Sequence, residues 1–339
     1  MRRAIFALVL SSTALAQPDL QQQAQALFKP LPARLESDTN PLTDAKIALG
    51  RQLFFDRRLS KNQDVSCNSC HPLARYGVER ERFSTGHRGQ KGGRNAPTVY
   101  NAGHHLAQFW DGRAATLEAQ AKGPMLNPVE MALPDGAAAE RVLRSIPGYK
   151  PMFAAAFPAD RSPITFDNAA LAIGAFERTL VTPSRFDRYL AGDDKALTAP
   201  EKEGLKQFIA TGCAACHHGE GVGGDLYQKL GVVKPLPGLT DPGRFDVTHD
   251  EADRFVFRVP SLRNVVLTGP YLHDGSVEKL DQMVVLMGRH QLGRELSKEE
   301  VSSIVIFLGS LTGQLPPDAV IAEPKPLPKS PQTPPPDPS

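Results

Sequence analysis

The sequence lacks several features that would narrow its function at once. It has no run of about 18 apolar residues, so no helix is expected to span a membrane. It has no marked excess of either charge, because 39 lysines and arginines face 37 acidic residues, and this argues against a nucleic-acid-wrapping protein. With 4 cysteines in 339 residues, it is not a disulfide-stapled miniprotein. Its length and 41% hydrophobic content instead predict a globular protein of roughly two domains.

The two ends of the chain have compositions that set them apart from the rest. Residues 1–16 carry Arg2 and Arg3, then a short apolar stretch and an A-x-A site ending at Ala16, which is the order of a secretory signal peptide. We therefore expect export to the periplasm. Residues 316–339 are rich in proline, which disfavours helices and central strands. This segment predicts a flexible extension, with a docking peptide as the alternative.

Between the ends, helix signals dominate and strand-like alternation is scarce. Thr198 with Glu201 and Ser297 with Glu300 have the spacing of capping boxes, and apolar residues follow each pair at helical intervals. Residues 166–180 also carry apolar side chains at helical spacing. Glycine- and proline-rich loops separate these segments. The fold class predicted is mainly α with long loops.

The cysteines fall in two copies of one pattern. Residues 67–71 read Cys-Asn-Ser-Cys-His and residues 213–217 read Cys-Ala-Ala-Cys-His. C-x-x-C-H is the signature of covalent c-type haem attachment, in which two thiols bind the porphyrin edge and the histidine coordinates the iron. Disulfides would not require the histidines, and a zinc ribbon would place its pairs about 15–20 residues apart. We therefore expect two haems, attached at Cys67, Cys70, Cys213 and Cys216 and ligated by His71 and His217.

The surroundings of the two motifs predict two cytochrome c-like domains. A helix expected over residues 43–56 precedes the first motif, and the helix that begins after Thr198 precedes the second. A helix leading into C-x-x-C-H is how small cytochrome c domains begin. The expected domains are residues 17–182 and 183–315, with the proline-rich tail behind them.

For the second haem, the sequence offers two methionines as sixth ligand. Met283 and Met287 lie four positions apart on a helix expected over residues 276–288. A thioether opposite histidine raises the reduction potential, because soft sulfur favours ferrous iron. Met287 is favoured because Gly288 marks the expected end of the helix, where the chain can turn. Met283 stays the alternative, and either methionine has the ordinary role of core filler as a competing explanation.

For the first haem, the candidate sixth ligand is a loop histidine. His87 lies in the glycine-rich segment 84–90, where it is mobile and reachable. Histidine opposite histidine leaves a lower potential than methionine does, so the two haems would form a directional electron path. The spacing alone does not choose His87 over His104 or His105.

Further segments, together with the two haem motifs, carry a family resemblance. They are G-H at 86–87, R-N-A-P-T at 94–98, Q-F-W-D-G-R at 108–113, Q-A-K-G-P at 120–124, V-E-M at 129–131, R-V-P-S-L-R-N at 258–264, G-P-Y-L-H-D-G at 269–275 and M-G at 287–288. On these residues the chain resembles the bacterial di-haem cytochrome c peroxidases, and the resemblance extends to about Leu315.

The resemblance implies roles for the residues at matching positions. Met287 corresponds to the ligand that makes the C-terminal haem the high-potential, electron-accepting site. His87 corresponds to the removable distal ligand of the N-terminal, peroxidatic haem. Trp110 corresponds to the residue between the haems.

Two further groups of residues take their roles from the resemblance alone. Gln120 and Glu130 correspond to the distal-pocket residues that handle peroxide. A calcium site between the domains is implied at Asn95, Thr268 and Pro270, whose side-chain and backbone oxygens suit a hard cation.

The function implied is the reduction of hydrogen peroxide to water. The electrons would come from a small periplasmic cytochrome c or blue-copper protein, and relatives are often homodimers. One alternative is a di-haem enzyme that oxidises a protein side chain, as in methylamine utilisation, although such enzymes have tyrosine where this chain has Met287. The other alternative is a di-haem electron carrier without catalysis.

Overall fold

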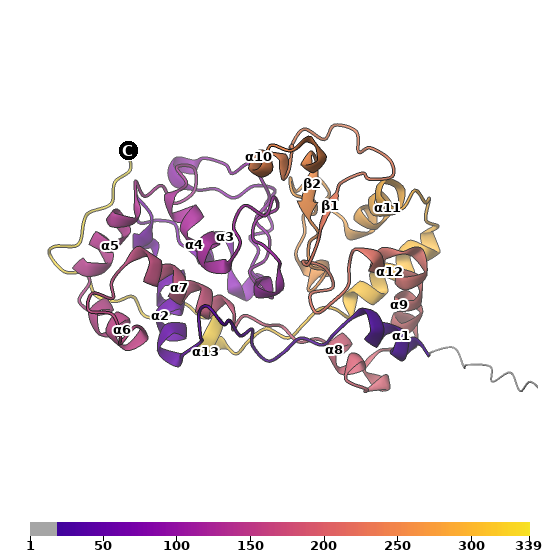
Figure 1. Cartoon of the computed structure of the whole chain (residues 1–339), viewed down its shortest axis with the longest axis horizontal. Coiled ribbons are helices and arrows are strands. Elements are labelled where there is room, and N and C mark those ends of the chain that lie inside the picture. Colours follow the sequence, from indigo (N-terminus) through magenta and orange to yellow (C-terminus); the bar gives the residue numbers. More distant parts are fainter. Residues whose placement is uncertain (1–18) are drawn as a thin grey trace, which may run out of the picture.

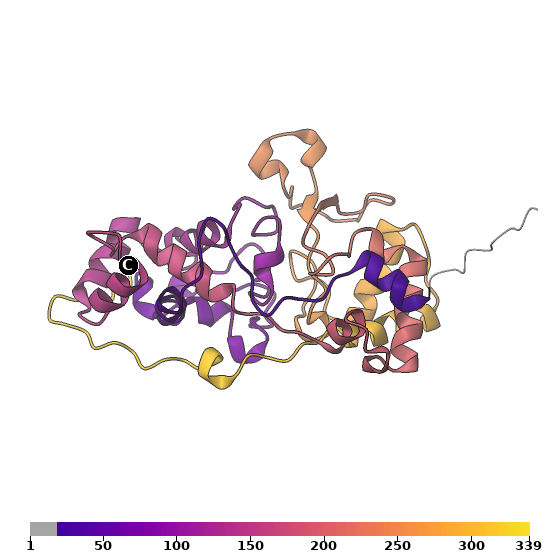
Figure 2. The same ribbon diagram turned by 60° about the horizontal axis from the view of Figure 1, so that its bottom comes forward.

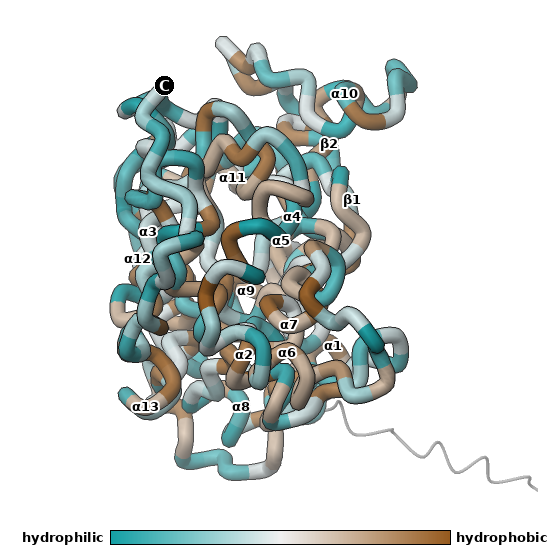
Figure 3. Tube along the Cα trace, turned by 90° about the vertical axis from the view of Figure 1, so that its left-hand side faces the viewer, coloured by the Kyte–Doolittle hydropathy of each residue, from teal (hydrophilic) through white to brown (hydrophobic). Residues whose placement is uncertain are grey.

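The computed structural model describes residues 19–339, so the expected signal peptide, residues 1–16, lies outside the described chain. The described part is mainly helical, as the sequence predicts, and its two strands, β1 (Tyr227–Lys229) and β2 (Val256–Arg258), form one short antiparallel pair. Figure 1 shows the helices gathered in two lobes side by side. Seen end on, hydrophilic segments occupy much of the periphery (Figure 3).

The N-terminal lobe is built around one buried helix. Its helices are α2 (Asp44–Phe54), α3 (Cys67–Cys70), α4 (Leu117–Leu126), α5 (Gly136–Ser145), α6 (Tyr149–Ala156) and α7 (Phe166–Glu177). Helix α7 is buried along nearly its whole length. Helix α2 approaches it so closely that a Cβ atom at Gly50 would lie 1.8 Å from the Ala172 carbonyl oxygen. Phe54 and Phe176 meet edge to face at this crossing.

The C-terminal lobe is organised by a second close helix pair. Its helices are α8 (Arg185–Leu190), α9 (Ala199–Thr211), α10 (Phe245–Thr248), α11 (Leu280–Gln291) and α12 (Lys298–Gly309). The capping boxes predicted at Thr198 and Ser297 are both formed and begin α9 and α12. These two helices pack through Phe208 and Phe307, whose ring centroids are 5.2 Å apart.

Helix α11 differs from its prediction in one respect that matters for the haem ligands. It begins at Leu280 and continues to Gln291, so Gly288 lies inside the helix and does not end it. Gly288 is buried, and a Cβ atom there would lie 2.9 Å from the Leu296 side chain. The glycine therefore permits close packing, and the expected turn after Met287 is wrong.

The two ends of the described chain are exchanged between the lobes. Helix α1 (Leu20–Leu27) lies on the C-terminal lobe, where Phe28 packs edge to face on Phe186 at 5.3 Å. The proline-rich tail crosses in the opposite direction and runs along the N-terminal lobe (Figures 1 and 2). The expected domain of residues 17–182 therefore differs from the lobe, because residues 20–28 complete the other core.

The tail is docked, in contrast to the flexible extension that was expected. It carries the short helix α13 (Asp318–Ile321), and then proceeds in an extended form. The Arg51, Arg58 and Gln63 side chains of the lobe donate to its carbonyl oxygens at Val320, Leu327 and Pro334, over 2.8, 2.7 and 2.7 Å. Proline lacks an N–H but keeps its carbonyl, so an extended proline-rich segment can be held by donors from a neighbouring surface.

Charged side chains join the lobes at their junction. Arg94 pairs with Asp111 at 2.5 Å and with Asp241 at 2.6 Å, and these carboxylates hold the pKa of the guanidinium above its usual value, against the effect of burial.

Within residues 19–339, no helix has the length and apolar character needed to span a membrane.

Candidate functional site

The second C-x-x-C-H motif opens onto a cavity between the lobes. Helix α9 ends at Thr211. The next residue, Gly212, has a φ of 95°, a left-handed conformation that favours glycine, and the chain turns there into the motif. Cys213, Cys216 and His217 all line the cavity. The C-terminal end of α9 therefore positions both thiols and the imidazole in the wall of this cavity.

Both lobes contribute to the walls of this cavity. Helices α11 and α12 supply apolar side chains, whereas the N-terminal lobe supplies His105 and Trp110 among others. Met283 and Met287 both line the cavity, so its geometry does not choose between them. His105 belongs to this second cavity, which removes it as an alternative to His87 at the first motif.

The protonation states in the second motif suit a covalent haem. Each of the four cysteines is free, and burial raises the pKa of the Cys213 thiol. Burial also lowers the pKa of His217 to about 4, which leaves a neutral imidazole able to bind a metal. Among residues 19–339, no three histidine, cysteine or acidic side chains are grouped to hold a metal ion by themselves. The thiols are thus free for a porphyrin and not arranged for zinc.

A buried arginine in the same cavity indicates that the cavity binds an anionic ligand. The Arg258 side chain is 2% exposed, and among the described residues it reaches only main-chain oxygens, of Phe109 at 3.4 Å and Val259 at 3.5 Å. Burial lowers its pKa to about 10. A buried cation without a carboxylate is costly, and the propionates of a haem would supply the missing charge. The ring nitrogens of His105, buried without partners in the described chain, line the same space.

Sequence reasoning missed Arg258 as a candidate haem contact and considered His105 only as a possible ligand of the first haem. Arg258 directly follows the apolar residues Val256 and Phe257. A charged residue in a segment expected to be buried was the signal that the sequence offered. Its lack of a partner becomes visible only in three dimensions.

The first motif presents its histidine in a comparable way. Ser66 forms a capping box with Ser69 that begins α3, and His71 follows at the end of this single turn. The Nδ1 atom of His71 lies 3.3 Å from the carbonyl oxygen of Gly77, and burial lowers the pKa of the imidazole. A histidine that uses one nitrogen to contact a carbonyl is oriented to offer the other to a metal.

The loop of His87 is fastened to the loop of Glu130. The His87 N–H donates to the Glu130 carbonyl oxygen over 2.7 Å. A Cβ atom at Gly86 would lie 2.2 Å from the Val129 carbonyl oxygen, so this position requires glycine. The His87 side chain is buried, with 5% of its surface exposed.

The Glu130 carboxyl group lies close to the first motif. Burial raises its pKa, while a hydrogen bond from the Asn127 side chain, 2.7 Å long, acts in the opposite direction. The Glu130 charge contributes to the raised pKa values of Cys67 and Cys70, although burial is the main cause. Gln120 lies half-buried on α4, and in the described chain no hydrogen bond joins its side chain to Glu130.

The lone tryptophan lies at the lobe junction. The Trp110 Nε1–H donates to the carbonyl oxygen of Asn95 over 2.9 Å, and its ring meets His273 edge to face at 6.4 Å. Trp110 also lines the cavity of the second motif. Its ring is therefore fixed in the wall between the N-terminal lobe and the second haem site.

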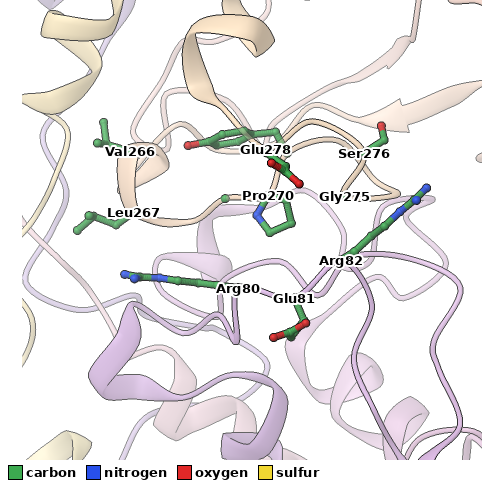
Figure 4. Close-up of a pocket in the computed structure, with 11 residues that line it drawn as sticks. Arg80, Glu81, Arg82, Val266, Leu267, Pro270, Gly275, Ser276 and Glu278 are labelled. Carbon is green, nitrogen blue, oxygen red and sulfur yellow. The ribbon is translucent and has the colours of Figure 1, made fainter.

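The three residues expected to bind calcium lie together at the same junction. Asn95, Thr268 and Pro270 all line the cavity of the second motif. The Asn95 amide donates to the Glu81 carbonyl oxygen over 2.9 Å, which leaves its side-chain oxygen available. Pro270 also borders a neighbouring open pocket, where Figure 4 shows the Glu81 and Glu278 carboxyl groups on either side of it.

Comparisons with known proteins agree with this arrangement. A family model for di-haem cytochrome c peroxidases matches residues 44–195. The cytochrome c551 peroxidase of Pseudomonas aeruginosa is 50% identical over 314 residues, covering 90% of each chain. That of Nitrosomonas europaea is 52% identical over 270 residues, covering 79% of this chain and 80% of its own. The crystal structure of a MauG-like protein associated with microbial copper homeostasis has a TM-score of 0.74 at 31% identity, covering 90% of this chain and 97% of that one.

The two haem motifs, the cavity with its unpaired cation and the near full-length similarity lead to one conclusion. The chain belongs to the di-haem cytochrome c peroxidase family, and it is an oxidoreductase that carries two c-type haems and acts on hydrogen peroxide.

Proposed function

We propose that the two haem sites divide the reaction, with electrons entering at the second motif and peroxide reacting at the first. The observation that carries this division is the buried carboxyl group of Glu130 near the first motif. The second cavity has methionine side chains in its wall instead. A haem at the first motif would supply the iron position where peroxide binds and the electrons that reduce it.

Glu130 would move the proton that cleavage of the peroxide bond requires. It would accept the proton of the oxygen nearer the iron and return it to the departing oxygen, which leaves as water. The raised pKa of Glu130 suits this role, because burial moves that pKa closer to neutral pH. One peroxide, two protons and two electrons then give two waters. Gln120 would orient the peroxide.

The remaining residues would control the supply of electrons. Met287 would be the sixth ligand of the second haem, and Trp110 would lie on the electron path towards the first. His87 would occupy the sixth position of the first haem at rest and leave it after the second haem is reduced. A calcium ion bound by Asn95, Thr268 and Pro270 would hold the lobe junction in place.

The physiological setting follows from the same proposal. The donor would be a small periplasmic cytochrome c or blue-copper protein, and the enzyme would work in the periplasm as a homodimer. The two alternatives predict other outcomes. An enzyme of the methylamine-utilisation type would oxidise a protein partner, and a pure carrier would turn over no peroxide.

A single substitution tests the central step. The Glu130→Gln variant keeps the size of the side chain but cannot accept a proton. We expect its peroxide turnover with a reduced cytochrome donor to fall by about 100-fold or more, the range of general acid–base catalysis, while both haem spectra stay unchanged. Glu203→Gln, at an exposed glutamate on α9, is the matched control and should retain full turnover. Undiminished turnover in Glu130→Gln would remove this residue from the mechanism.

A further inference from the structure

The proline-rich tail ends beside the histidine that is proposed to switch. The main-chain oxygen of Ser339 lies 3.0 Å from the Nε2 atom of His87. We propose that residues 335–339 form a latch that holds His87 off the iron of the first haem and so favours the open, peroxide-accepting site. This inference rests on the role proposed for His87.

The route of the tail brings Ser339 to this point. The Arg51, Arg58 and Gln63 contacts fasten it at Val320, Leu327 and Pro334, in the order in which the tail passes them. The Leu327 side chain is also seated so closely on Gly148 that a Cβ atom there would lie 2.9 Å from it. These points fix the register of the tail, so the residues that follow Pro334 arrive at a defined place.

Lys61 connects the end of the tail to the loop that carries Glu130. Its Nζ donates to the main-chain oxygen of Ser339 over 2.8 Å and lies 3.7 Å from the Asp337 carboxylate. The Asp337 N–H donates to the Lys61 carbonyl oxygen over 3.0 Å, and the Lys61 N–H donates to Met131 over 2.8 Å. Met131 directly follows Glu130, whose carbonyl oxygen holds the His87 N–H. Tail, Lys61 and both loops therefore form one connected group.

The contact has a direct consequence for the histidine. While Nε2 contacts the main-chain oxygen of Ser339, it cannot bind an iron, so the latched state and ligation through Nε2 exclude each other. The other ring nitrogen, Nδ1, is buried without a partner in the described chain, so the exclusion applies to ligation through Nε2 alone. The contact with Ser339 thus stabilises His87 with Nε2 released from the iron. A peroxidase of this kind would open its first site more completely than one whose displaced histidine has no partner.

The latch can be tested on the holoenzyme by removing residues 335–339. This deletion keeps the contacts of Val320, Leu327 and Pro334 and loses those of Asp337 and Ser339. The measurement is the ratio of first haems without a sixth ligand to those with one after one-electron reduction, read from absorption and electron paramagnetic resonance spectra. We expect this ratio to fall about five- to tenfold, the equivalent of one or two net hydrogen bonds. Lys61→Met should cause a fall in the same direction.

Two controls isolate the main-chain contact. Ser339→Ala keeps the main-chain oxygen that contacts His87, and Lys325→Met changes an exposed side chain of the tail while it keeps the main-chain oxygen that contacts Gln52. Both should retain the wild-type ratio within about twofold.

The outcomes separate the latch from the proposed function. If the wild type opens on reduction and the deletion opens equally or more, the latch alone is overturned, and Ser339 at most orients a bound histidine. If the wild type never gains an open haem, the switching role of His87 fails, and the latch fails with it.

Discussion

Single residues distinguish the two haem sites more clearly than the motifs do. The motifs are the same, C-x-x-C-H, in both copies. The first site adds Glu130, whose carboxyl group is buried with a raised pKa. The second adds the unpaired Arg258 and two methionines. The buried carboxyl group near the first motif is what the proposed proton transfer requires.

The choice between two methionines as ligand of the second haem stays a prediction at the residue scale. Met283 and Met287 both line the cavity, and the longer α11 removes the turn that favoured Met287. We retain Met287 as the prediction, because the family resemblance includes it. Met287→His should lower the midpoint potential of the second haem and block reductive activation, since imidazole favours ferric iron more than a thioether does. Potentiometric titration checks this, with Met283→Leu as the control; a shift in Met283→Leu alone would transfer the assignment.

At the scale of elements, two helix crossings hold the lobes and place the motifs. Helix α9 packs closely against α12 at Gly204, and α2 packs closely against α7 at Gly50. Helix α2 precedes the first haem motif, and α9 leads directly into Cys213 of the second. A change in a crossing would therefore move a thiol and an iron ligand together.

The crossing in the C-terminal lobe predicts the effect of one methyl group. A Cβ atom at Gly204 would lie 2.1 Å from the Ser303 carbonyl oxygen, so Gly204→Ala must separate α9 from α12. We expect a loss of about 1–3 kcal/mol in the free energy of unfolding, the range of overpacked cores, measured by urea titration. Gly309→Ala adds the same atom to α12, where nothing lies within 4 Å, and should leave stability equal or higher. Equal losses in both variants would contradict this role of the crossing.

The sequence was sufficient for those features that depend on local pattern. Capping boxes at Thr198 and Ser297 begin real helices, because a cap is formed by residues three positions apart. The lengths of helices were harder to predict from the sequence. Helix α11 continues past Gly288, because close packing on Leu296 accommodates a glycine inside the helix. Contacts between distant segments were not accessible at all. Docking of the tail was only the alternative prediction, and its partners could not be named, since Arg51 and Arg58 look like ordinary charged residues in the sequence.

At the scale of the whole molecule, each lobe is completed by the opposite end of the chain. Helix α1 and the residue after it add Ala24 and Phe28 to the core of the C-terminal lobe. The tail adds Val320, Ile321 and Leu327 to that of the N-terminal lobe. The lobes are thus tied by two crossing segments in addition to the ion pairs of Arg94.

Removal of the tail should weaken the lobe to which it is docked. A variant that ends at Leu315 loses three partly buried apolar side chains and several hydrogen bonds from the N-terminal lobe. We expect about 3 kcal/mol less stability there, combining partial burial with net hydrogen bonds. Hydrogen exchange followed by mass spectrometry should show faster exchange in α2 and α7 and little change in α9 and α12. The variant lacking only residues 335–339 is the control, and faster exchange in α9 and α12 instead would refute this division.

The exchanged ends also set an order of events during biosynthesis. A ribosome releases α1 first, yet its partners Phe186 and Phe208 are made much later. The N-terminal lobe, in turn, lacks Val320, Ile321 and Leu327 until the tail is made. Neither lobe can therefore complete its core from one unbroken stretch of the chain.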